Sequence, residues 1–558
     1  MKKHLLLITV INLILTAITL ISIIHITTIN QTANPDDVVS AWLMENYGVS
    51  SIDELVQQKL KEYGVQYTGN PFTTALYPGQ LQAENITGMH WYTYRGGSLF
   101  NRTDVIANPE QPASYIIFGE DNNNDGVYDI IYAKNASSGQ IEFSGTDAAT
   151  VIQNAINQLT NGGKIFIKAG TYECSQSIFL KDNVIIEGEG TKTILKAISL
   201  SEDFIRIYDV ENVTVSNIKI MHVGGSGYLL LIYVNTRNII VENCHFNGEG
   251  VGAGIGVMNI NNKNIWIKNN YLINFTYEAI AIGKNASNVI ISGNVISNCG
   301  RNGIWILGAT GYTLSDIIIS SNIVTKSQRS LGGGCIEVLR SDGSTIKRIL
   351  IENNILLSDG QEVATGCGIH VTGGGTTGEI TDVQILGNIV AGDFPANGIC
   401  VEGADGTYLN HDVLIANNLI DSPENIGIDV IYTTKASIIS NYIKNCGNKG
   451  IYIAVTSMGL VSDNVILNSG TAIYIATPNT VTIKNNVGFV TENSGSVEFS
   501  GTSVSFAHGL AGTPTGVWAS FNSTAYGGWT WTANSTHITI TVANSGSYTV
   551  YWRAEYQP

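Results

Sequence analysis

Charged residues are scarce in this chain, and its cysteines lack any regular spacing. Only 13% of the 558 residues are charged, and the formal net charge is −16. Because nucleic-acid phosphates require a basic surface, this balance argues against a nucleic-acid partner. No two cysteines form a CxxC pair, which argues against a zinc site and against a disulfide framework. We expect the seven to be small buried residues: Cys174, Cys244, Cys299, Cys335, Cys367, Cys400 and Cys446.

A short phrase recurs along the chain and brings nine asparagines into one column. Its copies include NIWIKNNYLI, RILIENNILL and DVLIANNLID, and successive column asparagines lie 22 to 34 residues apart. Short β-branched runs punctuated by Gly and Asn predict strands, and this spacing predicts a solenoid. The column consists of Asn270, Asn294, Asn322, Asn354, Asn388, Asn418, Asn441, Asn464 and Asn486.

Stacked asparagines indicate parallel β coils. An Asn at a turn tolerates left-handed backbone, and its amide can bond both the main chain and the Asn of the next coil. Each coil then buries its apolar face only against its neighbours. Weaker copies starting at Asn183, Asn212 and Asn238 predict further coils before the column begins.

Residues 1–33 are predicted to anchor the protein in a membrane. The run from Leu5 to Ile29 is apolar and uncharged, and it follows Lys2 and Lys3. Its length suits a bilayer span of roughly 20 residues better than a cleaved signal, with cleavage near Ala33 as the alternative. The rest of the chain would then lie on the extracellular face of the membrane. There its sequons become candidate glycosylation sites: Asn85, Asn101, Asn135, Asn274, Asn285, Asn522 and Asn534.

Two segments separate this anchor from the coils. Residues 34–110 are expected to form a helical stalk and a small α+β cap, with a capping box from Ser51 to Glu54. Residues 111–143 are expected to form a β-hairpin whose loop has the spacing D-x-N-x-D-G-x-x-D. Oxygen ligands at this spacing suit calcium, although a plain turn favours the same residues. The ligands would be Asp121, Asn123, Asp125, the carbonyl of Val127, and Asp129.

Residues 144–490 contain the coils, and their pattern resembles that of an all-β, right-handed parallel β-helix. Ala148, Val151, Ile152, Ala155 and Ile156 fall at helical spacing and predict a capping helix for the open end. The order DAATVIQNAI, GGKIFI, AGTY and EGEGT resembles the entry to the pectate-lyase-like superfamily. The resemblance implies a polysaccharide or surface glycan as partner and, through the tailspikes in that superfamily, a homotrimer. No catalytic signature of its polygalacturonases or alginate epimerases is present.

Residues 491–558 are predicted to form a small C-terminal β-sandwich. Alternating strands with regular turn signals favour that fold. The phrases HGLAGTP and YWRAEY are similar to those of small modules appended to viral and surface β-helix proteins. Trp529 and Trp531 share one face of their strand, where they would either stack on sugars or fill the sandwich core.

Candidate chemistry lies in the strand that follows each column Asn. By the period-two rule the middle residue of that strand points outward, with Glu402 one outward position further along. Adjacent coils lie about 4.8 Å apart, so acidic groups and His370 would meet between aromatic rings, as in a saccharide groove. The longest repeats, from Asn294 to Asn418, would add loops as its walls. The outward residues are Trp305, Glu337, His370, Cys400, Asp429, Tyr452 and Tyr474.

Two reaction types fit these residues. Glu402 and Asp429 could act as an acid and a base in glycoside hydrolysis, because like charges in adjacent coils should raise one pKa. Alternatively, His370 could abstract a proton from a uronate with Arg340 offsetting the charge, which is lyase or epimerase chemistry. We therefore interpret the chain as a membrane-anchored protein that binds polysaccharide and cleaves or epimerises it. The rival hypothesis is a non-catalytic adhesin or spike, and the residues do not identify the sugar.

Overall fold

The computed structural model describes residues 113–557 except 251, 331–332, 363–365, 375–376, 404–409, 455–457 and 477–479. The expected membrane anchor, residues 1–33, and the expected stalk and cap, residues 34–110, lie outside these described residues. Within residues 113–557, apart from those gaps, we find no helix that is both long enough and apolar enough to cross a membrane.

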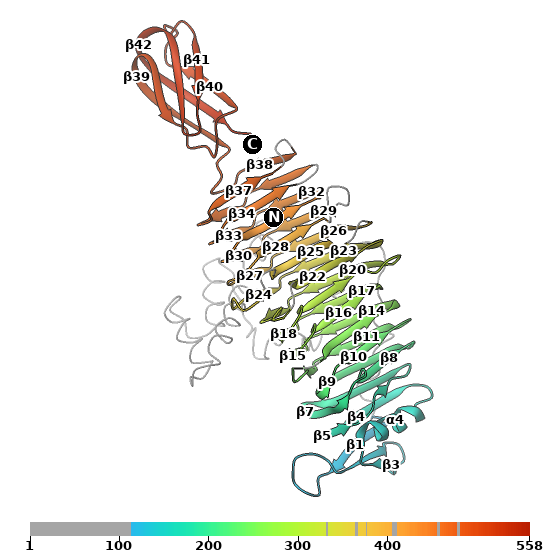
Figure 1. Ribbon diagram of the computed structural model, residues 1–558. Helices are drawn as coiled ribbons and strands as arrows, with labels where there is room; N and C mark the ends of the chain where they lie inside the picture. Colours follow the sequence, from blue (N-terminus) through green and yellow to red (C-terminus); the bar gives the residue numbers. More distant parts are fainter. Residues whose placement is uncertain are drawn as a thin grey trace, which may run out of the picture. The chain divides into compact units, whose positions relative to one another are not determined.

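Most of the described chain forms a parallel β-helix in which a typical coil contributes three strands (Figure 1). One side of this helix is a twelve-stranded parallel sheet. Its strands are β6 (Ile178–Phe179), β8 (Ile205–Tyr208), β10 (Tyr228–Tyr233), β13 (Ala253–Met258), β16 (Ile280–Gly283), β19 (Ile304–Leu307), β22 (Gly334–Ser341), β25 (Cys367–Gly374), β28 (Asn397–Glu402), β31 (Ile426–Ile431), β34 (Lys449–Ala454) and β37 (Thr471–Ile475).

The other two sides join in one large sheet because two long strands, β7 (Val184–Leu200) and β9 (Glu211–Gly225), run across both. The second side contains β4 (Gly163–Ile167), β11 (Arg237–Glu242), β14 (Ile260–Lys268), β17 (Asn285–Ser292), β20 (Thr313–Ser320), β23 (Ser344–Glu352), β26 (Gly378–Leu386), β29 (Asn410–Ala416), β32 (Thr433–Ile439), β35 (Gly459–Ser462) and β38 (Val481–Lys484). The third side contains β5 (Gly170–Cys174), β12 (His245–Asn247), β15 (Tyr271–Phe275), β18 (Val295–Cys299), β21 (Ile323–Thr325), β24 (Ile355–Leu357), β27 (Ile389–Ala391), β30 (Leu419–Asp421), β33 (Tyr442–Lys444) and β36 (Val465–Leu467).

The core of the helix consists of aligned β-branched side chains. In the twelve-stranded sheet, Ile304 pairs in register with Ile336, which pairs with Ile369, and all three are fully buried. Fully burying one such side chain contributes about 1.5–3 kcal/mol, so the repeated Ile and Val positions hold the coils together. The seven cysteines are also buried, as the sequence predicted, and carry free thiols in this structure.

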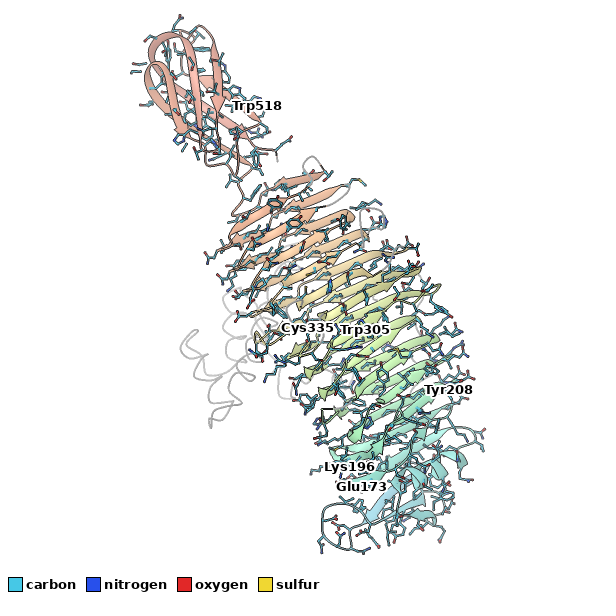
Figure 2. All side chains as sticks on the ribbon, viewed as in Figure 1. Glu173, Lys196, Tyr208, Trp305, Cys335 and Trp518 are labelled. Atoms are coloured by element: carbon cyan, nitrogen blue, oxygen red, sulfur yellow. The ribbon has the colours of Figure 1, made fainter. Side chains whose placement is uncertain are left out.

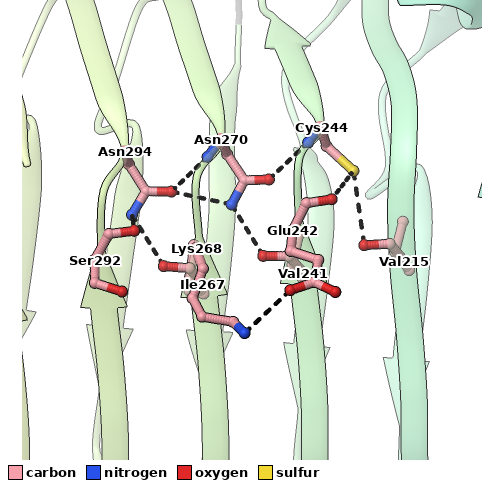
Figure 3. Close-up of polar contacts among 9 residues, drawn as sticks. All are labelled: Val215, Val241, Glu242, Cys244, Ile267, Lys268, Asn270, Ser292 and Asn294. Carbon is pink, nitrogen blue, oxygen red and sulfur yellow. Dashed lines mark hydrogen bonds and ion pairs between the residues drawn. The ribbon is translucent and has the colours of Figure 1, made fainter. Parts of the chain in front are cut away.

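The predicted asparagine column forms a continuous hydrogen-bonded ladder at the corner between the second and third sides. The Asn270 Nδ2 donates to Val241 O at 3.0 Å and to Asn294 Oδ1 at 3.0 Å (Figure 3). Asn270 Oδ1 accepts from the backbone N–H of Cys244, which occupies the column position one coil earlier (Figure 3). The same pattern repeats to Asn486, so each coil is bonded to the next through buried amides.

The N-terminal end of the helix is capped as expected. Strands β1 (Tyr115–Glu120), β2 (Ile130–Asn135) and β3 (Ile141–Gly145) pair antiparallel, and β1 also pairs parallel with β4. Helix α4 (Ala148–Gln158) begins at Asp147, whose side chain accepts from the backbone N–H of Thr150 at 2.9 Å. Its buried stripe, from Ala148 to Ile156, belongs to the same hydrophobic cluster as the coils.

The C-terminal module is a single four-stranded antiparallel sheet, made of β39 (Glu492–Ala507), β40 (Gly516–Phe521), β41 (Trp529–Ala533) and β42 (His537–Glu555). One end of β42 pairs with β40 and the other end pairs with β41. A register shift between Gly501 and Ser503 separates the two ends, and Phe506 from one end packs on Trp552 from the other, with ring centroids 4.9 Å apart. The sheet therefore encloses its own small core.

Candidate functional site

The strand register aligns the outward residues of the twelve-stranded sheet as the sequence predicted. Trp305 pairs with Glu337, Glu337 with His370, His370 with Cys400, and Cys400 with Asp429. The column continues through Tyr452 and Tyr474. Trp305 lies near the middle of the helix (Figure 2). We call this set, from Trp305 to Tyr474, the outward column.

His370 lies between two carboxylates. Its Nδ1 is 3.4 Å from Glu337 Oε1, and its Nε2 is 3.6 Å from Glu402 Oε2. Register alone pairs Glu402 with Thr372 and Ile431, but the side chain reaches back to the imidazole. Glu337, His370 and Glu402 thus form one group, and Asp429 lies in the next coil after Glu402. We call these four residues the acidic cluster.

Burial and neighbouring charges raise the pKa values of two groups in the acidic cluster, His370 and Asp429. Burial by itself would lower the pKa of His370, but the carboxylates of Glu337 and Glu402 outweigh it and raise the pKa to about 10. Burial, assisted by the charge of Glu402, raises the pKa of Asp429 from 3.8 to about 7. At neutral pH His370 is therefore an imidazolium, while Asp429 exchanges its proton readily.

A second set of side chains approaches the outward column, and sequence reasoning missed it. Asn397 precedes the coil glycine Gly398, and its Nδ2 donates to Asp429 Oδ2 at 3.0 Å. Cys367 precedes Gly368 in the same way and contacts Cys400, whose thiol pKa is raised by burial. The signal was present in the sequence as the residue before each coil glycine. We call this residue the flanking position.

Aromatic rings extend the outward column on the C-terminal side of the acidic cluster. Tyr452 and Tyr474 stack with ring centroids 5.5 Å apart and an interplanar angle of 6°. The Nζ of Lys449, at the flanking position of β34, lies 5.7 Å and 5.5 Å from the two ring centroids. Tyr474 is 47% exposed, so its ring is available to a ligand. Stacked rings beside acidic groups suit the faces of sugars.

Three residues proposed as sugar contacts lie elsewhere. Arg340 has the inward parity of β22, is only 1% exposed, and donates through its guanidinium to the carbonyl of Thr377. It does not lie on the outward face, because it is three positions from Glu337 on an alternating strand. Trp529 and Trp531 pack against the core of the C-terminal module, which is the alternative that their shared face allowed.

In the hairpin loop from Asp121 to Asp129, the acidic side chains accept hydrogen bonds from backbone N–H groups of the same loop. Asp121 accepts from the N–H groups of Asp125 and Gly126, at 3.3 and 2.9 Å. Asp129 accepts from the N–H of Asn122 at 2.7 Å, and Asp125 from that of Val127 at 2.9 Å. Across the described part of the chain, no group of three or more His, Cys, Asp or Glu side chains is arranged to hold a metal ion.

A cavity of about 400 Å³ lies away from the acidic cluster, at the turns that lead from the twelve-stranded sheet into the second side. Its lining includes Asp209, Arg237 and Lys263. These residues belong to coils that precede Trp305, so the cavity and the acidic cluster are separate features. Buried titratable groups come together in the acidic cluster, where Glu337 and Asp429 are 7% and 9% exposed.

A family model described as a right-handed β-helix region matches residues 203–390 and 367–545. No curated protein matches the chain. Among solved structures, the mannuronan C-5 epimerase AlgE4 A-module of Azotobacter vinelandii is 18% identical, with a TM-score of 0.38 over 61% of this chain and 96% of that one. The catalytic domain of a GH87 alpha-1,3-glucanase is 16% identical, with a TM-score of 0.46 over 62% and 68%.

A tailspike of Escherichia coli bacteriophage HK620 is 12% identical, with a TM-score of 0.42 over 74% of this chain and 90% of that one. At these identities the similarity concerns the fold alone. The substrate and chemistry of this chain therefore have to be argued from its own residues.

Proposed function

This chain belongs to the right-handed β-helix family, and we propose that it binds polysaccharide along its twelve-stranded sheet and transforms it at the acidic cluster. The observation that carries this proposal is the arrangement of His370 between Glu337 and Glu402, beside a buried Asp429 whose pKa is raised to about 7. A proton-holding acid next to an ionised carboxylate is the combination that glycan chemistry requires.

The acidic cluster assigns a different role to each group. Asp429 is the proton donor and acceptor, because its pKa lies near neutral pH. Glu402, one coil earlier, is the second carboxyl group of the pair. His370 already carries a proton at neutral pH, so it holds the two glutamates in place and offsets their charge rather than abstracting a proton. This favours glycoside hydrolysis over the alternative in which His370 is the base.

The experiment is a survey of polysaccharides with two readouts. The full-length protein is tested for binding on a glycan array and for release of reducing ends from dextran, mannan, polygalacturonate and alginate. We expect binding and reducing-end release on at least one polymer. A rise in absorbance from unsaturated ends would indicate a lyase instead of a hydrolase. Binding without any product would reject catalysis.

That last result would support the rival function, a surface adhesin or trimeric spike in which the β-helix is a spacer. The C-terminal module offers an observation in its favour, because Trp518 and Tyr551 are 52% and 55% exposed. The guanidinium of Arg553 lies 5.8 Å from the Trp518 ring centroid. Exposed rings of this kind can stack on surface glycans.

Residues 1–33 are proposed to anchor this activity at the extracellular face of the cell membrane. Deleting them is expected to move the protein from the membrane pellet to the soluble fraction, because the apolar run from Leu5 to Ile29 is removed. Carbonate extraction followed by immunoblotting measures the partition. A truncated protein that still pelleted with washed membranes would contradict the anchor.

The loop from Asp121 to Asp129 is proposed to bind calcium. Asp125→Ala is expected to abolish a binding heat measured by calorimetry, since it removes one of the oxygen ligands that the spacing provides. Asn122→Ala is the matched control, because the spacing assigns Asn122 no ligand role. An absence of binding heat in the unmodified protein, together with a melting temperature insensitive to EDTA, would leave the loop a plain turn.

A further inference from the structure

A pair of tyrosine rings lies on the twelve-stranded sheet, away from the acidic cluster. Tyr208 ends β8 and Tyr233 ends β10, and the two residues pair in register. Their neighbours Ile207 and Ile232 are fully buried, so the alternation of a strand turns both tyrosines outward. The rings stack with centroids 5.7 Å apart and an interplanar angle of 20°. Tyr208 is 55% exposed and lies on the N-terminal side of Trp305 (Figure 2). We call this pair the tyrosine platform.

The cavity of about 400 Å³ begins at the turns where the tyrosine platform ends. Asp209, which directly follows Tyr208, and Asn235, two residues after Tyr233, both line it. Consecutive Cα atoms are about 3.8 Å apart, so the tyrosine platform and the cavity are neighbours. Both lining residues are exposed, so a ligand can enter from solvent. The cavity volume falls within the roughly 300–1,000 Å³ of small-ligand sites.

The cavity lining contains charges of both signs. Asp182, Asp209 and Glu211 supply carboxylates, while Arg237 and Lys263 supply cations. Arg237 pairs in register with Glu211 on one side and with Lys263 on the other, so acceptors and donors lie in successive coils. A hydroxyl group both donates and accepts, so a ring with several hydroxyls can use both kinds of group. A charged ligand would instead meet like charge from one part of the lining. The lining therefore favours a neutral, hydroxyl-rich ligand.

We propose that the tyrosine platform and the adjacent cavity form a second sugar-binding site, which holds a neutral ring of the polymer far from the acidic cluster. One face of a sugar stacks on the exposed Tyr208 ring, as sugars do on aromatic side chains. Its hydroxyls donate to Asp209 and accept from Arg237. This inference rests on the proposed polysaccharide function and deepens it, because it assigns a neutral sugar to this part of the polymer.

The second site lies in line with the acidic cluster but several coils before it. Tyr233 and Glu402 occupy the same outward row of the twelve-stranded sheet, six register steps apart. At about 4.8 Å a step, the separation is about 29 Å. A polymer can occupy both places at once, which raises its affinity through linked binding. A tetrasaccharide is too short to do so.

The test compares long and short ligands in the full-length protein. Tyr208→Ala removes the exposed ring, and Asp209→Asn removes a charge at a left-handed position, φ 54°, that Asn tolerates. Dextran, mannan, polygalacturonate and alginate are titrated by calorimetry, and reducing-end release is measured on each polymer and on its tetrasaccharide. We expect each variant to bind dextran or mannan about tenfold more weakly. Turnover of the tetrasaccharide should stay unchanged.

The matched control is Tyr442→Ala, since Tyr442 is 41% exposed but lies on the third side of the helix. It should leave binding of every polymer unchanged. Melting temperatures confirm that each variant is folded.

Three results would contradict the second site in different ways. Binding of dextran or mannan that neither Tyr208→Ala nor Asp209→Asn weakens would overturn the site and leave the proposed function in place. Binding of polygalacturonate or alginate that Tyr208→Ala removes would overturn the assignment to a neutral ring. No binding heat with any polymer would overturn the proposed function, and the second site with it. Binding that depends on Tyr208 without any product would support the site and reject catalysis at the acidic cluster.

Discussion

Asp429→Asn is expected to lower turnover on a responsive polysaccharide at least about 100-fold while the protein stays folded. The amide keeps the shape of the side chain and can still bond Asn397, which now donates to Asp429 Oδ2 at 3.0 Å. It cannot release or take up the proton that leaves and returns during glycan cleavage. Initial rates of reducing-end release measure the effect.

Glu402→Gln is expected to lower turnover by a similar factor for a different reason. This substitution removes the second carboxyl group of the pair, which is also one of the two carboxylates that raise the pKa of His370. Asp463→Asn and Glu379→Gln are the matched controls, because both residues are exposed and lie off the outward column. Full turnover in both amide variants of the acidic cluster would reject catalysis there.

The raised pKa of Asp429 also predicts how activity and stability depend on pH. The rate should fall as pH rises through about 7, because Asp429 then loses the proton that it donates. Its contribution to the free energy of unfolding is present below its unfolded pKa of about 3.9 and is lost as pH rises through about 7. In Asp429→Asn, the midpoint of chemical denaturation should therefore change less with pH between about 3.9 and about 7 than in the unmodified protein.

The raised pKa of His370 also makes the free energy of unfolding fall as pH rises, but over a higher pH range than Asp429. Its folded pKa of about 10 lies above its ordinary value of 6.5, so its stabilising contribution is complete below pH 6.5 and disappears as pH approaches 10. Midpoints that did not decline between those values in the unmodified protein would contradict the ion pairs around the imidazole.

The coil architecture could be predicted from the sequence because each coil repeats the same short sequence pattern. The column from Asn270 to Asn486 had only to be aligned, since a ladder of amides requires Asn at one position in every coil. The capping helix was equally accessible, because α4 has an N-cap Asp147 and a regular apolar stripe. Both signals are local, and neither depends on side-chain reach.

The acidic cluster was accessible only in part. Period-two parity correctly put Glu337, His370 and Asp429 on one face, but Arg340 has the opposite parity and is buried. The repeat pattern predicted Glu402 beside Asp429, whereas the register pairs Glu402 with Ile431, and its long side chain reaches the His370 ring. Such reach depends on rotamers, which a repeat pattern does not contain.

The flanking positions were missed because parity fails at the coil glycines. Asn397 donates to Asp429 in the outward column although it is three residues from Cys400 and therefore has the opposite parity. A Cβ at Gly398 would lie 2.6 Å from the Ile420 side chain, which explains why a larger residue is excluded there. The contact of Asn397 with Asp429 therefore depends on packing between coils, which lies beyond any single strand.

Asn354→Ala is expected to lower the free energy of unfolding by about 4 kcal/mol, the largest stability effect predicted for this chain. Its Nδ2 donates to Ile319 O at 2.9 Å and to Asn388 Oδ1 at 3.0 Å. Its Oδ1 accepts from the N–H and the Nδ2 of Asn322, at 2.9 and 3.0 Å. The side chain is fully buried, so water does not replace these bonds. Urea denaturation followed by circular dichroism measures the loss.

Two comparisons separate the ladder from a general effect of losing an amide. Asn157→Ala, at an exposed position of α4, should change stability by less than about 0.5 kcal/mol. Asn486→Ala, at the last position of the ladder, should lower stability less than Asn354→Ala, because Asn486 accepts from Asn464 but donates only to backbone carbonyls. In a solenoid each coil is stabilised by its neighbours, so the loss at Asn354 interrupts contacts on both sides. Equal losses at Asn354 and Asn157 would show that the ladder does not hold the coils together.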